Sequence, residues 1–204
     1  YPPFSFWGEE DAPCVESLLN SPEPGDAPLG LYYHVPFCRK RCHFCYFRVY
    51  TDKNSSDIRR YLSATMQELR QYAERPYVAG RKPKYVYFGG GTPSYLSAQQ
   101  LTELTDEMKA IMPWDETEEV TFECEPGTLT EKKLEVIKNF GVTRLSLGIE
   151  NFSDHVLDIN GRAHRSPEVF RAYDYARGLG FDNVNVDLIA GMLDETDENW
   201  VDSV

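Results

Sequence analysis

Residues 31–45 read LYYHVPFCRKRCHFC, and this stretch decides both the fold and the chemistry that the sequence predicts. Leu31–Val35 is an apolar run with the length of a buried strand. Cys38, Cys42 and Cys45 follow it directly. Because thiolates are the normal ligands of iron–sulfur clusters, the pattern indicates a cluster on the loop after a first strand.

The three cysteines form an incomplete ligand set for a four-iron cubane. Three irons can be bound by thiolates while the fourth stays open for a substrate or cofactor, as in a catalytic cluster. Zinc and a chance arrangement are the alternatives. A structural zinc ion needs a fourth ligand, which His34, His43, Cys14 or Cys124 would have to supply. We interpret Cys14 and Cys124 as ordinary free cysteines.

The composition narrows the function classes. The chain has 204 residues, 41% of them hydrophobic, and a net charge of −12, which argues against a broad nucleic-acid surface. No apolar run is long enough for a membrane span, and the start lacks the pattern of a secretory signal. Five cysteines make a poor disulfide framework, so a cytoplasmic protein is expected. The basic run Arg39–Arg41 either serves an anionic ligand or consists of solvated charges.

The rest of the chain predicts alternating strands and helices. Strands are expected at 31–35, 84–88, 119–124, 143–149 and 182–189. Helices are expected over 57–73, 97–111, 130–140, 166–178 and from 197 onward. Such alternation is typical of an α/β fold with a parallel sheet. Residues 1–29, acidic and rich in Pro and Gly, are expected to form an arm with little regular structure, and 30–204 the core domain. The chain ends after strand five, so we expect a truncated domain.

Several predicted strands carry polar residues on one face, which is unusual in a parallel sheet. If the sheet curls, these faces meet inside it and bring together Tyr32, His34, Glu123, Glu150 and Asp187. Buried carboxylates need partners, so we favour a ligand site there. Ion pairs among themselves or with Arg144 or Arg162, or exposure at the strand ends, are the alternatives.

The cysteine spacing after the first strand resembles the radical S-adenosylmethionine (SAM) superfamily. Longer segments resemble the oxygen-independent coproporphyrinogen III oxidase family and its relatives, which include heme chaperones and class C radical SAM methyltransferases. The segments are 32–38 (YYHVPFC), 88–93 (FGGGTP), 123–126 (ECEP), 147–152 (LGIENF), 161–162 (GR) and 187–191 (DLIAG). The resemblance implies a TIM-like (β/α)6 barrel, here partial.

The resemblance also implies a [4Fe–4S] cluster on the three cysteines, with SAM bound at the open iron. The positions it assigns to SAM are Tyr32, Phe44, Gly90, Gly91, Thr92, Glu123, Glu150, Arg162 and Asp187. The glycine turn would receive the SAM amino end, because glycine lets the backbone approach closely. Glu123 would bind the ribose, and Arg162 would pair with the SAM carboxylate.

Two positions depart from the oxidase pattern. The oxidase has glutamine where this chain has Glu150, and Gly-Cys where this chain has Tyr46 and Phe47. The resemblance implies an oxidoreductase of heme biosynthesis: reductive SAM cleavage gives a radical that removes hydrogen from a porphyrinogen propionate, which then loses CO2. A class C methyltransferase and a non-enzymatic heme chaperone remain alternatives. The expected partners are a small-molecule substrate and an electron donor such as flavodoxin or ferredoxin, without nucleic acid or membrane.

Overall fold

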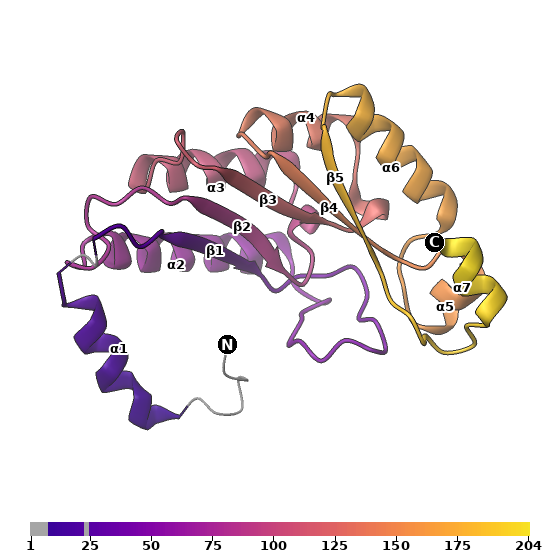
Figure 1. Ribbon diagram of the computed structural model, residues 1–204, viewed down its shortest axis with the longest axis horizontal. Helices are drawn as coiled ribbons and strands as arrows, with labels where there is room; N and C mark the ends of the chain where they lie inside the picture. Colours follow the sequence, from indigo (N-terminus) through magenta and orange to yellow (C-terminus); the bar gives the residue numbers. More distant parts are fainter. Residues whose placement is uncertain (1–7, 23–24) are drawn as a thin grey trace.

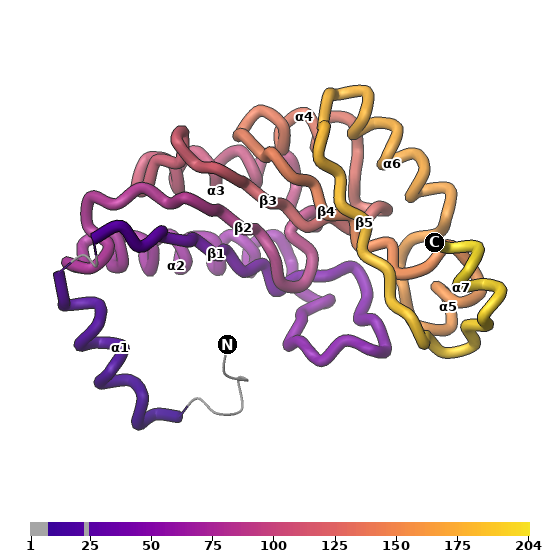
Figure 2. Tube along the Cα trace, viewed as in Figure 1, coloured from indigo at the N-terminus to yellow at the C-terminus, as the bar shows by residue number. Residues whose placement is uncertain are grey.

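A computed structural model describes residues 8–22 and 25–204 and contains a five-stranded parallel sheet in the order β1-β2-β3-β4-β5 (Figure 1). The strands are β1 (Gly30–Val35), β2 (Tyr85–Gly90), β3 (Glu119–Cys124), β4 (Arg144–Glu150) and β5 (Asn183–Leu188). Sequence order and spatial order coincide, as successive β/α units of a barrel require. The predicted α/β fold with five parallel strands is confirmed, and the curved sheet is consistent with part of a TIM-like barrel (Figure 2).

Four helices connect the strands and cover one face of the sheet (Figures 1 and 2). They are α2 (Ser55–Ala73), α3 (Ala98–Ile111), α4 (Glu131–Asn139) and α6 (Ser166–Gly178). The side chain of Asn54 caps α2, that of Ser97 caps α3 and that of Thr130 caps α4. Each of these helices buries one apolar stripe against the sheet, which fixes its orientation.

The hydrophobic core lies between the sheet and these helices. Phe88, Phe122, Leu145 and Leu147 are fully buried there, and the rings of Phe88 and Phe122 lie 5.3 Å apart. Because strand residues alternate, the neighbours of these side chains face the opposite side of the sheet. That side carries the polar residues of the predicted site.

The shorter elements differ in part from the prediction. Residues 12–19 form a helix, α1 (Ala12–Leu19), preceded by a 3-10 turn, η2 (Glu9–Asp11), so the expectation of little regular structure was wrong there. Residues 1–7 and 23–24 of the predicted arm lie outside the described residues. A further helix, α5 (Asp154–Ile159), was not predicted, whereas α7 (Asp197–Ser203) was. Among the described residues, no helix has the length and apolar character needed to span a membrane.

The strand register decides where the site forms. Val35 pairs with Gly90, Glu123 with Ser146, and Gly148 with Asp187. The carboxyl ends of neighbouring strands therefore lie at one edge of the sheet, where ligands bind in parallel α/β folds. Two 3-10 turns, η3 (Pro93–Tyr95) and η4 (Pro126–Thr128), follow β2 and β3 at this edge.

Candidate functional site

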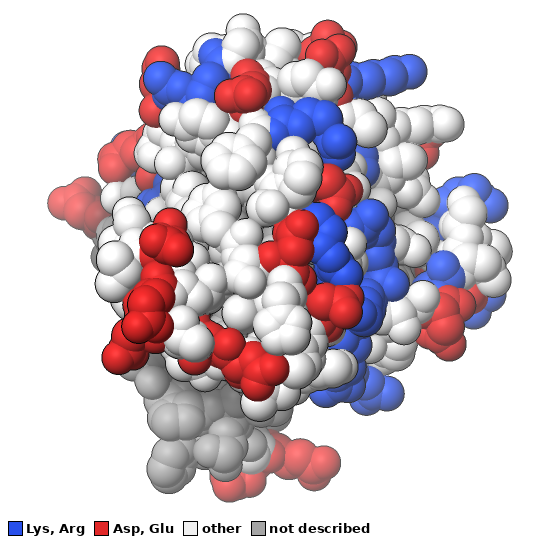
Figure 3. All heavy atoms as spheres, turned by 90° about the vertical axis from the view of Figure 1, so that its right-hand side faces the viewer, with Lys and Arg blue, Asp and Glu red and all other residues white. Residues whose placement is uncertain are grey.

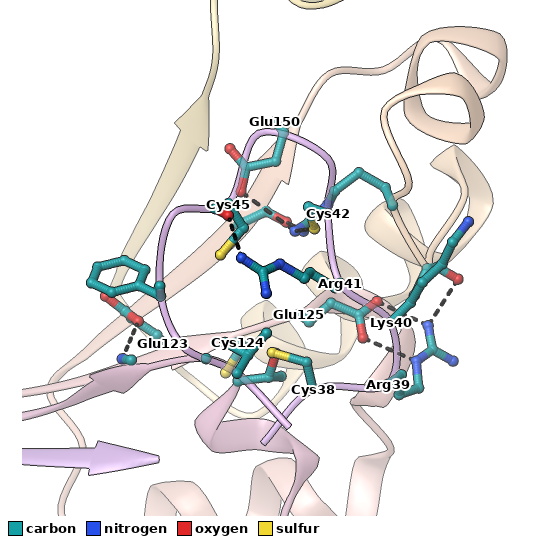
Figure 4. Close-up of a pocket in the computed structure, with 18 of the residues that line it drawn as sticks. Cys38, Arg39, Lys40, Arg41, Cys42, Cys45, Glu123, Cys124, Glu125 and Glu150 are labelled. Carbon is teal, nitrogen blue, oxygen red and sulfur yellow. Dashed lines mark hydrogen bonds and ion pairs between the residues drawn. The ribbon is translucent and has the colours of Figure 1, made fainter. Parts of the chain in front are cut away.

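The cysteine motif lies on residues 36–50, hereafter the cysteine loop, which connects the end of β1 to the segment before α2 (Figure 4). Its two ends are tied together by backbone hydrogen bonds: Cys38 N donates to Tyr50 O at 3.1 Å, and Tyr50 N donates to Pro36 O at 2.8 Å. Cys38 is buried, and Cys42 and Cys45 are half-buried. The loop therefore begins as a closed turn at the edge of the sheet.

All three cysteines line one cavity of about 230 Å³. Of the predicted SAM-binding residues, this cavity is also lined by Phe44, Gly90, Gly91, Thr92, Glu123, Glu150, Arg162 and Asp187. Tyr32 does not line it. Tyr32 is 56% exposed, its ring stacks on Tyr87, and its hydroxyl oxygen lies 3.0 Å from His34 Nδ1. The structure thus brings eleven of the twelve predicted site residues to one cavity.

The thiols are spread around the cavity and have polar neighbours. Thr92 Oγ1 donates to Cys38 Sγ at 3.3 Å, and Arg162 Nη1 donates to Cys42 Sγ at 3.4 Å. Burial raises the pKa of the Cys38 thiol, while the hydrogen bond from Thr92 acts in the opposite direction. In the described part of the chain, no three His, Cys, Asp or Glu side chains gather closely enough to hold one metal ion. Cysteine thiolates are the ordinary protein ligands of iron–sulfur clusters, so the three thiols that line this cavity are candidate ligands of one.

The glycine turn after β2 passes close against the first cysteine. A Cβ on Gly91 would lie 2.9 Å from Cys38 Sγ and 3.0 Å from Val35 O. Gly90 has a φ of 115°, a conformation that side chains disfavour. The turn therefore needs glycine both for its shape and for its approach to the cysteine loop.

Glu123 is held from two sides. Tyr87 Oη donates to its Oε1 at 2.6 Å, and Gly90 N donates to its Oε2 at 3.2 Å. Burial raises the pKa of this carboxyl, although both hydrogen bonds lower it. The Tyr87 contact was not predicted, although the period of two along β2 puts Tyr87 on the site face.

Glu150 and Arg162 form a mostly buried pair, with Nη1 and Oε1 3.7 Å apart. Arg162 also donates to Gly148 O, and its Nε is buried without a hydrogen-bond partner among the described residues. Burial raises the pKa of Glu150, and the charge of Arg162 opposes this shift. Glu150 has a φ of 68° where the register between β4 and β5 shifts, which is a strained position for a residue other than glycine.

Asp187 belongs to a polar group on the inner face of β4 and β5. Ser146 Oγ donates to Asp187 Oδ2 at 2.8 Å, and Asn185 Nδ2 donates to Asp187 Oδ1 at 2.8 Å. The carboxylate is thus satisfied by neutral donors. The sequence left open whether these carboxylates pair with Arg144 or Arg162, and Glu150 does form an ion pair with Arg162.

The basic residues of the cysteine loop lie at the site as well. The sequence alone did not decide between this position and solvated charges. Arg39, Lys40 and Arg41 all line the cavity. The guanidinium of Arg41 lies between the cysteine side chains and donates to Cys45 O at 3.2 Å (Figure 4). Figure 3 looks onto the end of the molecule where the strands finish, and there a band of basic side chains lies beside acidic ones. The cavity lining itself contains both signs of charge, since Arg and Lys side chains line it together with Glu and Asp side chains, and this suits a zwitterionic ligand.

Comparison with known proteins gives a consistent result. Residues 32–204 match the Radical SAM superfamily. Heme chaperone HemW of Bacillus subtilis is 36% identical over 167 residues, which cover 81% of this chain and 43% of the relative. Oxygen-independent coproporphyrinogen III oxidase of Salmonella typhimurium is 31% identical over 191 residues, covering 94% of this chain and 41% of the relative.

A solved structure agrees with these sequence matches. Coproporphyrinogen III oxidase HemN of Escherichia coli superimposes with a TM-score of 0.83 at 30% identity, covering 97% of this chain and 44% of that chain. The chain spans less than half the length of these relatives.

Proposed function

This chain belongs to the radical SAM superfamily, whose members use a [4Fe–4S] cluster and SAM, and we propose that Cys38, Cys42 and Cys45 bind such a cluster here. One observation carries the proposal: three thiols border the same cavity as Glu123, Glu150 and Arg162. Three cysteine ligands leave one iron of a cubane open, and the acidic and basic groups beside it suit a zwitterionic amino acid such as the methionyl part of SAM.

The residues that line the cavity fit these two groups. Hydrogen bonds from Thr92 and Arg162 to the sulfurs of Cys38 and Cys42 would stabilise thiolate charge, as hydrogen bonds to metal ligands do in other proteins. The buried Nε of Arg162 lacks a partner within the described residues, so a bound carboxylate would satisfy it. The close glycine turn brings backbone groups to the cavity wall.

Bound together, the cluster and SAM supply one-electron chemistry that removes a hydrogen atom from a substrate. The chain's own residues bind and orient. Arg162 would hold the SAM carboxylate, the turn at Gly90 and Gly91 would receive its amino group, and Glu123 would accept hydrogen bonds from its ribose. Tyr87 and Gly90 N fix the carboxylate of Glu123 for that task. Asp187, held by Ser146 and Asn185, would be a further contact.

For the substrate we propose a porphyrinogen whose propionate undergoes oxidative decarboxylation, with electrons from a donor such as flavodoxin or ferredoxin. The structural likeness to HemN and the 31% identity to the oxidases support this. Lys40 and Arg41 on the cavity wall carry the charge that propionates would need.

A heme chaperone is the second candidate, and one observation favours it. Tyr46 is 86% exposed and stacks on Phe47 with ring centroids 4.6 Å apart, at the position where the oxidase pattern differs. Such a platform suits a flat ring system. The 36% identity to HemW supports the same reading.

Turnover separates the candidates. Anaerobically reconstituted full-length protein would receive SAM, dithionite and coproporphyrinogen III. Formation of protoporphyrinogen IX with 5′-deoxyadenosine supports the oxidase, and heme binding without turnover supports the chaperone. Methyl transfer without decarboxylation would indicate the methyltransferase alternative. Failure to bind iron and sulfide would overturn the proposal as a whole.

A further inference from the structure

Arg39, the residue after Cys38, reaches away from the cysteine loop and attaches it to the core (Figure 4). Its Nε donates to Glu125 Oε2 at 3.1 Å, and its Nη2 donates to Glu125 Oε1 at 2.9 Å. The same Nη2 donates to Ala163 O at 3.0 Å. One guanidinium thus connects the loop to the end of β3 and to the segment beside Arg162.

Glu125 is the buried half of this pair. Its side chain is 9% exposed, so its charge must be satisfied inside the protein. Gly127 N donates to its Oε1 at 3.2 Å, and His164 Nδ1 lies 3.5 Å from the same oxygen. His164 is fully buried, and its Nε2 lies 3.1 Å from Ile149 O. Burial alone would raise the pKa of Glu125, but His164 and Arg39 outweigh it and hold the pKa below its usual value.

The backbone leaves room for this contact at one glycine. A Cβ on Gly127, in the turn η4, would lie 2.3 Å from Arg39 Nη2 and 2.9 Å from Glu125 Oε1. Any side chain there would displace the guanidinium. Glycine at position 127 therefore leaves the space that the ion pair between Arg39 and Glu125 occupies.

The far end of the cysteine motif has its own attachment. His43 N donates to Asn160 O at 3.0 Å, and His43 Nδ1 lies 2.9 Å from Ile159 O, at the end of α5. His43 sits between Cys42 and Cys45, whereas Arg39 sits beside Cys38. With both attachments made, the spacing between the first thiol and the other two is fixed by the core.

We propose that Arg39 and Glu125 are positioning residues that hold Cys38 at the spacing the cluster requires, with His164 supporting Glu125 from behind. This rests on the proposed function. The cysteine loop contains no helix or strand of its own, so it would otherwise have to be ordered when the cluster binds, at a cost in conformational entropy. Groups that orient metal ligands from behind are commonly worth 10- to 100-fold in metal affinity.

The test compares Arg39→Met, Glu125→Gln and the double variant with the wild-type full-length protein, all reconstituted anaerobically. Arg70→Met is the matched control, because it breaks an ion pair with Glu107 between α2 and α3. Far-UV circular dichroism and thermal unfolding check the fold. The double variant removes both charges together, so it does not leave Glu125 buried and unpaired.

The rate of iron loss to a chelator is the first measurement. We expect Arg39→Met and Glu125→Gln to lose iron about 10- to 100-fold faster than wild type, with Arg70→Met unchanged. The double variant should be no worse than the worse single variant, because both act through one contact. We also expect the electron paramagnetic resonance spectrum of the reduced cluster to change in Arg39→Met. Wild-type rates and spectra in both single variants would overturn the proposal.

A second measurement keeps the inference separate from the proposed function. Amide hydrogen exchange of residues 38–45 in metal-free protein should be faster in Arg39→Met than in wild type or Arg70→Met. If wild-type protein fails to bind iron and sulfide, the proposed function falls, while exchange still reports on the attachment. If the cluster forms but exchange and iron loss are unaltered, only the positioning role falls.

Discussion

Arg162 Nη1 donates a hydrogen bond of 3.4 Å to the sulfur of Cys42, 120 residues earlier in the chain. The same side chain pairs with Glu150 and donates to Gly148 O. One guanidinium therefore touches a cysteine of the motif, the end of β4 and the cavity in which a carboxylate would bind. The thiol and the proposed SAM site are coupled through this residue.

Arg162→Lys should lower the affinity for SAM by more free energy than it lowers the stability of the fold. Lysine keeps the charge but loses the planar fork, so it cannot serve Cys42, Gly148 and a carboxylate together. We expect about a tenfold loss in SAM affinity, the order of one charged hydrogen bond. Titration of the reconstituted protein with SAM measures it. Arg177→Lys, at the end of α6, is the control, and equal affinities in both variants would contradict the assignment.

Gly91→Ala should reduce cluster content. The added Cβ would lie 2.9 Å from Cys38 Sγ and within 3.1 Å of two backbone oxygens, which cannot move aside cheaply. Cys38 would then be displaced. Iron and sulfide per chain after reconstitution measure the effect. Gly178→Ala meets nothing within 4 Å and should retain full content; equal content in both variants would argue against the close approach.

Cys38→Ser should abolish the cubane, whereas Cys14→Ser should retain it. Cys38 lines the cavity, and Cys14 is exposed on α1. The visible absorption of the reconstituted protein and its iron and sulfide contents give the comparison. A cluster retained in Cys38→Ser would remove the basis of the proposed ligand set.

Glu150→Gln should alter the pH dependence of stability. Burial raises the pKa of Glu150 above 4.5, so the folded state holds this proton more tightly than the unfolded state does. The resulting stability is present at low pH and is lost as the pH rises from 4.5 through the raised value. The free energy of unfolding of metal-free protein, measured with urea, should therefore fall less steeply over this pH range for Glu150→Gln than for wild type. Parallel curves for the two proteins would refute the shift.

Glu150→Gly should be more stable than Glu150→Ala. Both variants remove the carboxylate, but only glycine accepts a φ of 68° without strain. The expected difference in unfolding free energy is about 1 kcal/mol. Denaturant unfolding at one pH measures it, and an alanine variant at least as stable as the glycine variant would mean that the strain is relieved elsewhere.

Much of the fold follows from local patterns in the sequence. Apolar residues alternate with polar ones or follow one another along the strands, and α2 and α3 begin at clear N-caps and carry apolar stripes. The observed bounds of these strands and helices therefore differ from the predicted bounds by only one or two residues. Helix α5 was missed because six residues give too little periodicity to recognise. Helix α1 was missed because its neighbourhood is rich in Pro and Gly, although Pro13 is suited to a first helical turn.

The sequence indicated most of the residues that line the cavity, but it did not indicate the contacts between them. Motif and strand alternation placed the cysteines, Glu123 and Asp187 at one edge. The bond from Arg39 to Glu125 joins residues 86 positions apart, and no spacing rule predicts which charges meet over that distance. Tyr32 shares the inner face as expected, yet it turns toward Tyr87 and His34 and does not line the cavity. The SAM-binding role of Tyr32 stays a prediction, as do the SAM-binding roles of the residues that line the cavity.

Among the described residues, β5 is paired on one side by β4 and ends the sheet. Its other side presents backbone donors and acceptors in a row, and Val186 on this strand is 40% exposed. A second molecule can pair one of its strands with such an exposed edge, so concentrated samples of residues 1–204 should self-associate. Light scattering across a dilution series should therefore accompany every spectroscopic measurement on them.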